Sequence, residues 1–78
     1  MGELQGFPFG TAIHELQLGH KVARKGWNGK DMYLELQVPD ENSKMTLPYI
    51  YIYTATKDLV PWLASQTDIL STDWVTVK

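Results

Sequence analysis

The spacing of hydrophobic residues predicts a helix near the start of the chain. Four apolar residues recur at i, i+3, i+4 and i+7, the spacing of one helical face: Phe9, Ala12, Ile13 and Leu16. We expect the helix at about 10–18, with either Thr11 or Gly10 as its N-cap. Gly19 then occupies the position of the left-handed residue that ends a helix. The apolar face of this helix needs a sheet to cover it.

Alternating apolar and polar residues predict the strands of that sheet. Residues 32–38 alternate between the two kinds, as in a strand that is buried on one face. Residues 49–54 form the strongest strand, because aromatic and β-branched side chains favour sheets. Its isoleucines are expected to join the core. Its three tyrosines either pack against a neighbouring strand or form a subunit contact: Tyr49, Tyr51 and Tyr53.

Shorter elements complete the predicted fold. Ser65 followed by Asp68 matches a capping box and predicts a short helical turn at about 65–71. Short strands are expected at 59–60 and 73–77. We therefore expect one domain over residues 1–78 with an α+β fold. An N-terminal amphipathic helix packs on a small antiparallel β-sheet, and the short helical turn lies near the C-terminus.

Composition excludes several classes of protein. A chain of 78 residues without cysteine is too short for a multidomain enzyme and has neither disulfides nor thiolate chemistry. No apolar run approaches the roughly 20 residues of a transmembrane helix, and the first residues do not resemble a signal peptide. We therefore expect a cytoplasmic protein. Trp62 and Trp74 are expected in the core, but nine aromatic residues are many for so small an interior. Some should face a partner or a ligand.

The net charge of −2 conceals an uneven distribution. Residues 21–30 carry four bases and no acid, whereas the rest of the chain carries three bases and nine acids. A protein that binds long nucleic acids usually presents a basic domain. One short basic segment on an acidic body suits a small anionic ligand better. A solvated, lysine-rich turn is the alternative interpretation.

Sequence motifs of catalysis and metal binding are weak. His14 and His20 are six residues apart, which is not a zinc-ligand spacing on a helix. The serines lie in no nucleophile motif, and no phosphate-binding loop occurs. We therefore expect neither an enzyme nor a bound metal or cofactor.

Residues 24–30 combine the groups that a nucleotide-like ligand needs. Trp27 offers a flat face for stacking on a base. Asn28 carries a donor and an acceptor, and Arg24 can bind phosphate oxygens with two parallel hydrogen bonds. Gly26 and Gly29 let the backbone approach a ligand closely. The alternative is a hairpin turn in which Trp27 only covers the edge of the core.

A second polar cluster lies at the start of the predicted C-terminal helical turn. Backbone N–H groups point outward there, beside the side chains of Ser65, Gln66, Thr67 and Asp68. Capping alone explains Ser65 and Asp68 but leaves Gln66 and Thr67 without a role.

Residues 21–30 and 60–70 resemble the phage-encoded Thoeris anti-defence family of the second type. Members of that family also begin with an F-G-x-A-[IL] helix, here at residues 9–13, and end near a D-W motif, here at residues 73–74. The resemblance extends over residues 9–77.

This resemblance implies a sponge rather than an enzyme. Family members bind the cyclic ADP-ribose isomers made by bacterial TIR-domain defence proteins, without cleaving them, in the cytoplasm of the infected host. Some also hold cyclic dinucleotides of the CBASS pathway in a separate site. The resemblance also implies a homo-oligomer, expected to be a tetramer, with ligand pockets at subunit contacts. The motif match implies a ligand site made of Arg24, Trp27, Asn28, Gly29, Gln66, Thr67 and Asp68.

The chain departs from the family pattern in one loop. Family members have a longer stretch, rich in proline and glycine, than residues 39–47, and a P-H-I-D-like segment where this chain has residues 48–51. Contacts from that loop, including those of a second nucleotide site, are therefore not transferred to this chain. Two other functions stay open: an enzyme that cleaves the nucleotide with Asp68 or His20 as base, and a protein-interaction module that docks through its tyrosines.

Overall fold

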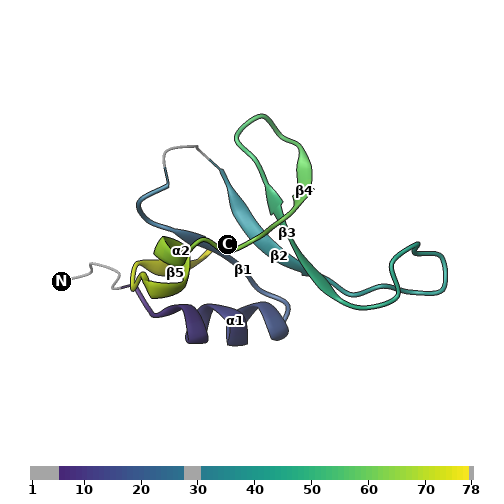
Figure 1. Ribbon diagram of the computed structural model, residues 1–78, viewed down its shortest axis with the longest axis horizontal. Coiled ribbons are helices and arrows are strands. Elements are labelled where there is room, and N and C mark those ends of the chain that lie inside the picture. The colour runs from purple at the N-terminus through teal and green to yellow at the C-terminus, as the bar shows by residue number, and fades with distance from the viewer. Residues whose placement is uncertain (1–5, 28–30, 78) are drawn as a thin grey trace.

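A computed structural model describes residues 6–27 and 31–77. In chain order the elements are α1 (Phe9–Gln17), β1 (Lys21–Arg24), β2 (Tyr33–Gln37), β3 (Tyr49–Tyr53), β4 (Leu59–Pro61), α2 (Gln66–Leu70) and β5 (Trp74–Val77). The strands form one sheet in the order β4-β3-β2-β1-β5, and every pair is antiparallel. Helix α1 lies against the β1, β2 and β5 part of the sheet (Figure 1). The predicted α+β fold is confirmed.

The start of α1 differs from the prediction. The N-cap is Pro8, whose backbone is extended, rather than Thr11 or Gly10, and no side chain caps the helix. The carbonyl oxygen of Pro8 accepts hydrogen bonds from the N–H groups of Thr11 and Ala12, both at 3.1 Å. Just before it, Phe7 pairs with Trp74 as an isolated β-bridge. This bridge fixes the chain immediately before the proline, so the helix begins at Phe9, two or three residues earlier than capping by Gly10 or Thr11 would indicate.

The end of α1 follows the prediction. Gly19 has φ of +92°, and its N–H donates to Leu16 O at 3.0 Å. The N–H of His20 donates to Glu15 O at 3.0 Å. These two bonds form a Schellman motif, which requires a left-handed residue directly after the helix.

The strand register separates an inner from an outer face of the sheet. Val22 pairs with Leu34, and Leu34 pairs with Ile52, so these three side chains lie on the inner face. The predicted burial of the isoleucines is confirmed, because Ile50 and Ile52 pack against the core. On the outer face the three tyrosines of β3 lie opposite Gln37, Glu35 and Tyr33.

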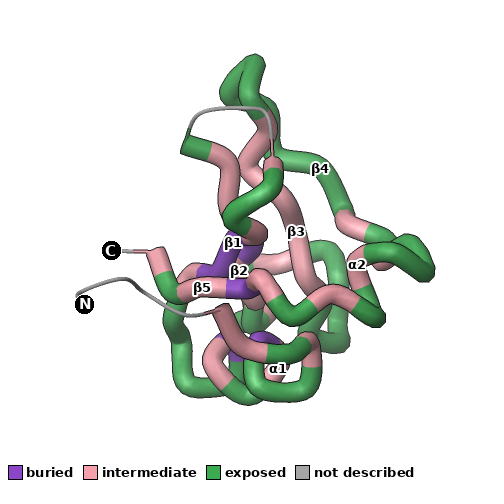
Figure 2. The backbone as a smooth tube through the Cα atoms, turned by 90° about the vertical axis from the view of Figure 1, so that its left-hand side faces the viewer, coloured by how far each residue is buried: buried purple, intermediate pink, exposed green. Residues whose placement is uncertain are grey.

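The core lies where β1, β2 and β5 pass over α1 (Figure 2). Trp74 is its largest fully buried side chain, with 0% exposure. Trp62 is half-buried and packs against it, so both tryptophans belong to the core, as predicted. The other members of the buried cluster are Ala12, Leu16, Val22 and Leu34.

The tyrosines of β3 make cross-strand contacts within the chain. Tyr53 stacks on Tyr33 with ring centroids 5.0 Å apart, and the Tyr51 hydroxyl donates to Glu35 Oε1 at 2.6 Å. Burial raises the pKa of Tyr51, and the hydrogen bond to Glu35 raises it further. The packing interpretation is therefore confirmed, while a subunit contact through the same face stays a prediction.

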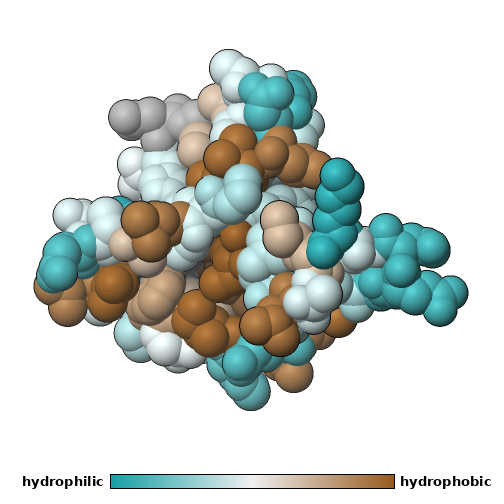
Figure 3. All heavy atoms as spheres, turned by 45° about the vertical axis from the view of Figure 1, so that its right-hand side comes forward, coloured by the Kyte–Doolittle hydropathy of each residue, from teal (hydrophilic) through white to brown (hydrophobic). Residues whose placement is uncertain are grey.

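The connection between β2 and β3, residues 38–48, projects away from both helices (Figure 1). Its tip is held by its own hydrogen bonds, including Ser43 N–H to Asp40 O at 3.0 Å. Leu47 is nevertheless 75% exposed. Hydrophobic side chains also gather across the middle of the face shown in Figure 3. Neither described helix lies over the end of the sheet at which β2 and β3 run into this connection (Figure 1).

No helix within the described ranges is long and apolar enough to cross a membrane.

Two glycines at opposite ends of α1 should respond oppositely to substitution by alanine. Gly19→Ala should lower the free energy of unfolding by about 1–2 kcal/mol, because an L-residue is strained at this positive φ. Gly10→Ala should raise it by about 0.5–1 kcal/mol, because Gly10 lies inside the helix and its Cβ would meet no other atom within 4 Å. Urea denaturation of both variants measures the two shifts, and equal signs would contradict this description of α1.

Candidate functional site

Arg24, at the end of β1, joins the two segments that the sequence singles out. Its Nε donates to Asp73 Oδ1 at 2.9 Å, and its Nη1 donates to Asp68 Oδ1 at 3.1 Å. The side chain of Arg24 is only 18% exposed and that of Asp68 only 14%. A single guanidinium therefore ties β1 to α2 and to the residue before β5.

Asp73 also holds the turn that follows β1. Its Oδ2 accepts a hydrogen bond from the Gly26 N–H at 3.1 Å, and its backbone carbonyl accepts one from the Lys25 N–H at 3.0 Å. The Trp27 N–H donates to Arg24 O at 3.2 Å and closes the turn. Three consecutive residues thus contact one aspartate.

The predicted capping box at α2 is confirmed. The N–H of Asp68 donates to Ser65 Oγ at 3.1 Å, and the Asp68 carboxylate accepts from the Ser65 N–H at 3.0 Å. The Ser65 hydroxyl adds a bond of 2.9 Å to the same carboxylate. Both carboxylate oxygens of Asp68 are therefore engaged within the chain, one by Ser65 and the other by Arg24.

Trp27 is half-buried and packs on the core. Its ring centroid lies 5.6 Å from that of Trp74, with the planes at 79°. Trp74 in turn donates from Nε1 to Asp68 O at 3.0 Å. Trp27 and Asp68 thus both contact Trp74 of β5, the residue that pairs with Arg24 of β1.

The remaining predicted site residues have different places. Gln66 and Thr67 are exposed on α2. The Thr67 carbonyl accepts a bond of 2.6 Å from the Ser71 hydroxyl. Asn28 and Gly29 lie outside the described residues, so the predicted turn at these two positions stays a prediction.

The pKa values of the ion-paired groups follow from these contacts. The hydrogen bond from Arg24 lowers the pKa of Asp73 despite partial burial, and the Gly26 N–H lowers it further. Burial acts to raise the pKa of Asp68, but the hydrogen bonds from Ser65 and Arg24 outweigh it and the net pKa is lowered. The hydrogen bond to Asp73 raises the pKa of Arg24. All three groups are charged at neutral pH.

This arrangement changes the role expected for Arg24. Two donors of its guanidinium already bind carboxylates, so a phosphate would have to compete with both aspartates. Asp73 is the residue that sequence reasoning missed, since it entered only as part of the D-W motif. One signal in the sequence could have indicated this pairing. The acidic residues outside residues 21–30 are numerous enough to form ion pairs with the basic residues inside that segment.

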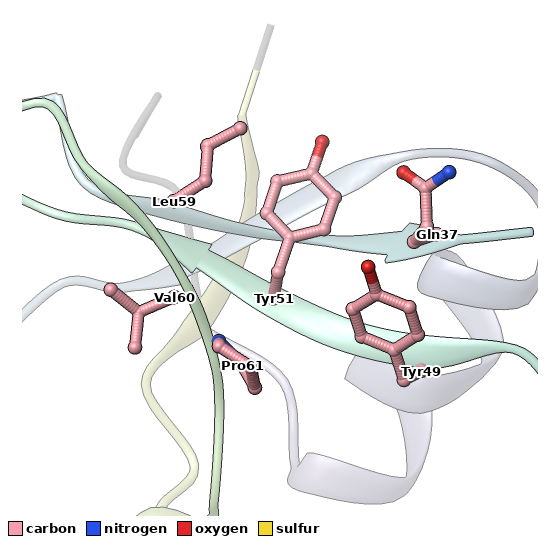
Figure 4. A pocket seen from close by; sticks show the side chains of 6 residues that line it. All are labelled: Gln37, Tyr49, Tyr51, Leu59, Val60 and Pro61. Carbon is pink, nitrogen blue, oxygen red and sulfur yellow. The ribbon is translucent and has the colours of Figure 1, made fainter. Parts of the chain in front are cut away.

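Two cavities lie at the other end of the sheet. One, of about 130 Å³, is lined by Gln37, Tyr49, Tyr51, Leu59, Val60 and Pro61, and its Gln37 and two tyrosines project from one face of the sheet (Figure 4). The other, of about 450 Å³, is lined by Met45, Thr46, Leu47, Pro48, Tyr49 and Pro61. Neither cavity is lined by a predicted site residue.

Metal binding has no support in the part of the chain that the structure describes. No group of three or more histidine, aspartate or glutamate side chains there is placed to hold a metal ion. His20 instead contacts Glu15, with Nδ1 2.7 Å from Oε1.

The ion-paired aspartates should make stability depend on pH in the acidic range. A lowered folded-state pKa means that the stabilisation is complete above the ordinary aspartate pKa, near 4, and is lost as the pH falls through the lower folded value. Asp68→Asn should lower the free energy of unfolding at pH 7 and should reduce its fall between about pH 4 and pH 2. Urea unfolding at several pH values measures this, with the exposed Gln66→Ala as control. An unchanged pH dependence in Asp68→Asn would contradict the role of the carboxylate.

Residues 7–77 match the family model described as "Thoeris anti-defense 2-like domain". The protein named "Thoeris anti-defense 2" from Bacillus phage SP01 is 37% identical over 79 aligned positions, which cover 85% of this chain and 89% of the phage protein. The match includes the whole described sheet and both helices, and it supports a role in phage anti-defence. The chain belongs to the Thoeris anti-defense 2-like family.

Proposed function

We propose that this protein is a phage anti-defence sponge. It binds cyclic ADP-ribose-type signalling nucleotides made by bacterial TIR-domain immunity and sequesters them without cleavage, in the cytoplasm of the infected bacterium. Removal of a signal by equilibrium binding needs a tight pocket and a stoichiometric amount of protein, but no reactive group. A nanomolar complex corresponds to ~12 kcal/mol of binding free energy, and preorganised groups make such values attainable.

The observation that carries this proposal is the contact between Arg24 and Asp68. It joins residues 24–27 to the start of α2 across 44 positions of sequence, at 3.1 Å. The turn that carries Trp27 is therefore tied to the helix that carries the exposed polar side chains of Gln66 and Thr67. The ring provides a stacking face, and the amide and hydroxyl provide hydrogen bonds to a sugar or a base edge.

The internal ion pairs favour sequestration over cleavage. A general base needs a carboxylate or imidazole that is available to accept a proton from substrate or water. The carboxylate of Asp68 instead accepts bonds from Ser65 and Arg24, and its pKa is lowered. His20, the other candidate base, contacts Glu15 at the far end of α1 from the Trp27 turn.

Recovery of the ligand tests the proposal directly. The protein is mixed with a cyclic ADP-ribose isomer prepared with a bacterial TIR-domain enzyme, and free ligand is removed. The complex is then heat-denatured and the supernatant is analysed by mass spectrometry. We expect intact nucleotide in near-stoichiometric amount. Breakdown products would favour the enzyme, and no bound nucleotide would favour a protein-interaction module.

The variant Trp27→Ala tests whether nucleotide binding depends on the Trp27 ring. It should raise the Kd by roughly 10–100-fold through lost stacking. Trp27→Phe retains an aromatic face and should lose much less. Circular dichroism confirms that each variant is folded, and equal affinity of all three proteins by calorimetry would remove Trp27 from the site.

Self-association is part of the proposal, with a homo-oligomer, expected to be a tetramer, as the active form. Support comes from the end of the sheet that α1 does not cover. Three exposed apolar side chains line the two cavities in this region. Leu59 and Val60 line the smaller cavity, and Leu47 lines the larger one. A chain of this size buries a smaller share of its surface than a larger domain, so association is an effective way to cover apolar side chains.

Light scattering should therefore give a mass that is a multiple of 8.9 kDa. Leu47→Glu should shift the protein toward the monomer, because it places a charge on the uncovered apolar end. The matched control is Leu18→Glu, which changes an exposed leucine after α1. A wild-type monomer at tens of micromolar would contradict an oligomeric sponge.

A further inference from the structure

We infer that Asp73 is the positioning residue of the nucleotide site: it fixes the turn at residues 24–27 and thereby the orientation of the Trp27 ring. This inference rests on the function proposed above, since it assigns to Asp73 an effect on ligand affinity that acts through Trp27. Asp73 itself need not touch the ligand.

Asp73 accepts three hydrogen bonds from the turn, two on its carboxylate and one on its backbone carbonyl. One carboxylate oxygen accepts from Arg24 Nε at 2.9 Å, and the other accepts from the Gly26 N–H at 3.1 Å. The Asp73 carbonyl accepts from the Lys25 N–H at 3.0 Å. The turn is thus held at three successive residues, and Trp27 is the next residue along the chain.

Asp73 is itself held firmly on its other side. Directly after it, Trp74 exchanges two backbone hydrogen bonds with Phe7, at 2.8 and 3.2 Å. Gly6 lies so close that a Cβ atom there would be 2.5 Å from the Asp73 Cα. Asp73 therefore lies between the N-terminal segment, which fixes its backbone, and the turn, which its carboxylate holds in place.

Glycine at position 26 is matched to this contact. A Cβ atom at Gly26 would lie 3.2 Å from Asp73 Oδ2, which is tighter than ordinary van der Waals contact. The φ angle of Gly26 is not positive, so alanine is compatible with its backbone. Gly26→Ala therefore perturbs the same contact from the opposite partner with little change elsewhere.

Without the Asp73 carboxylate, the Trp27 ring loses its fixed position on Trp74. Among the contacts described above, the backbone of the turn then keeps the bond from Lys25 to the carbonyl of residue 73 and its own closing bond from Trp27 to Arg24. Arg24 keeps its second partner, Asp68, so the variant retains one ion pair and should fold. A ligand must then order the ring on binding, which lowers the affinity.

The test is a double-mutant cycle between positions 73 and 27, with the Kd for the cyclic ADP-ribose isomer measured by calorimetry. Asp73→Ala should raise the Kd about tenfold in the wild-type background. In the Trp27→Ala background the same change should alter the Kd by less than about twofold, because the ring through which it acts is absent. Equal losses in both backgrounds would overturn the inference and indicate a general structural role or a direct contact.

Two further variants sharpen this test. The side chain in Asp73→Asn has one oxygen, which can accept a hydrogen bond from Arg24 or from Gly26 but not from both. The nucleotide affinity of this variant should therefore fall between those of the wild type and Asp73→Ala. Gly26→Ala should also weaken nucleotide binding. The matched control is Asp58→Asn, which removes a carboxylate from a turn outside the site, where it accepts from Thr56 at 2.9 Å. It should leave the Kd unchanged. A loss in Asp58→Asn equal to that in Asp73→Asn would overturn the assignment.

A spectroscopic measurement separates failure of this inference from failure of the proposed function. In a Trp62→Phe background, Trp27 and Trp74 remain as the tryptophan pair, and their close contact gives coupled circular dichroism near 230 nm. Asp73→Ala should reduce this signal even without ligand, whereas Asp58→Asn should not. An unchanged signal would overturn the positioning role. If the wild type binds no nucleotide but Asp73→Ala still loses the circular dichroism signal, the proposed sponge function would be overturned, whereas the role of Asp73 in positioning Trp27 would stand.

Discussion

The structure depends on the burial of one indole, that of Trp74. Its ring contacts those of Phe9, Trp27 and Trp62 at centroid distances of 5.5, 5.6 and 6.0 Å. A buried indole N–H needs an acceptor, and Trp74 finds it in the carbonyl of Asp68 at 3.0 Å. That bond sets the position of α2, a helix of only 5 residues that none of its own side chains anchors in the core. The buried Trp74 side chain thus contacts α1, the turn at Trp27 and α2 at once, and holds these short segments together.

The polar network around Trp74 has a consequence for ligand binding. Arg24 supplies one positive charge, while Asp68 and Asp73 supply two negative charges, so the triad is anionic at neutral pH. A phosphate approaching the triad gains little from the guanidinium alone. In the proposed sponge, affinity for an anionic nucleotide would therefore rest mainly on stacking and on neutral hydrogen-bond donors. The ion pairs would contribute by holding those groups still, which reduces the entropic cost of binding.

Features encoded over a few residues could be predicted from the sequence, whereas those made between distant residues could not. The alternation in β2 and β3, the left-handed Gly19 and the capping box of Ser65 and Asp68 each depend on near neighbours, and all agree with the structure. The contact of Arg24 with Asp73 spans 49 positions and carries no local signal, so the sequence alone does not predict it. The N-cap of α1 is not predictable for a similar reason, because Phe7, directly before Pro8, is held by a bridge to the distant Trp74.

Strand geometry also divides the basic segment that the sequence presents as one unit. Lys21 and Arg24 are three residues apart on β1, so their side chains leave opposite faces of the sheet. Arg24 reaches the aspartates on the side of Trp74, whereas the Lys21 ammonium lies 4.6 Å from the Tyr33 ring centroid on the outer face. The Lys57 ammonium lies 5.9 Å from the ring of Tyr53, which stacks on Tyr33, so this face has its own aromatic and cationic surface. The positive charge counted along residues 21–30 is therefore not one patch, and a ligand at the Trp27 turn meets only part of it.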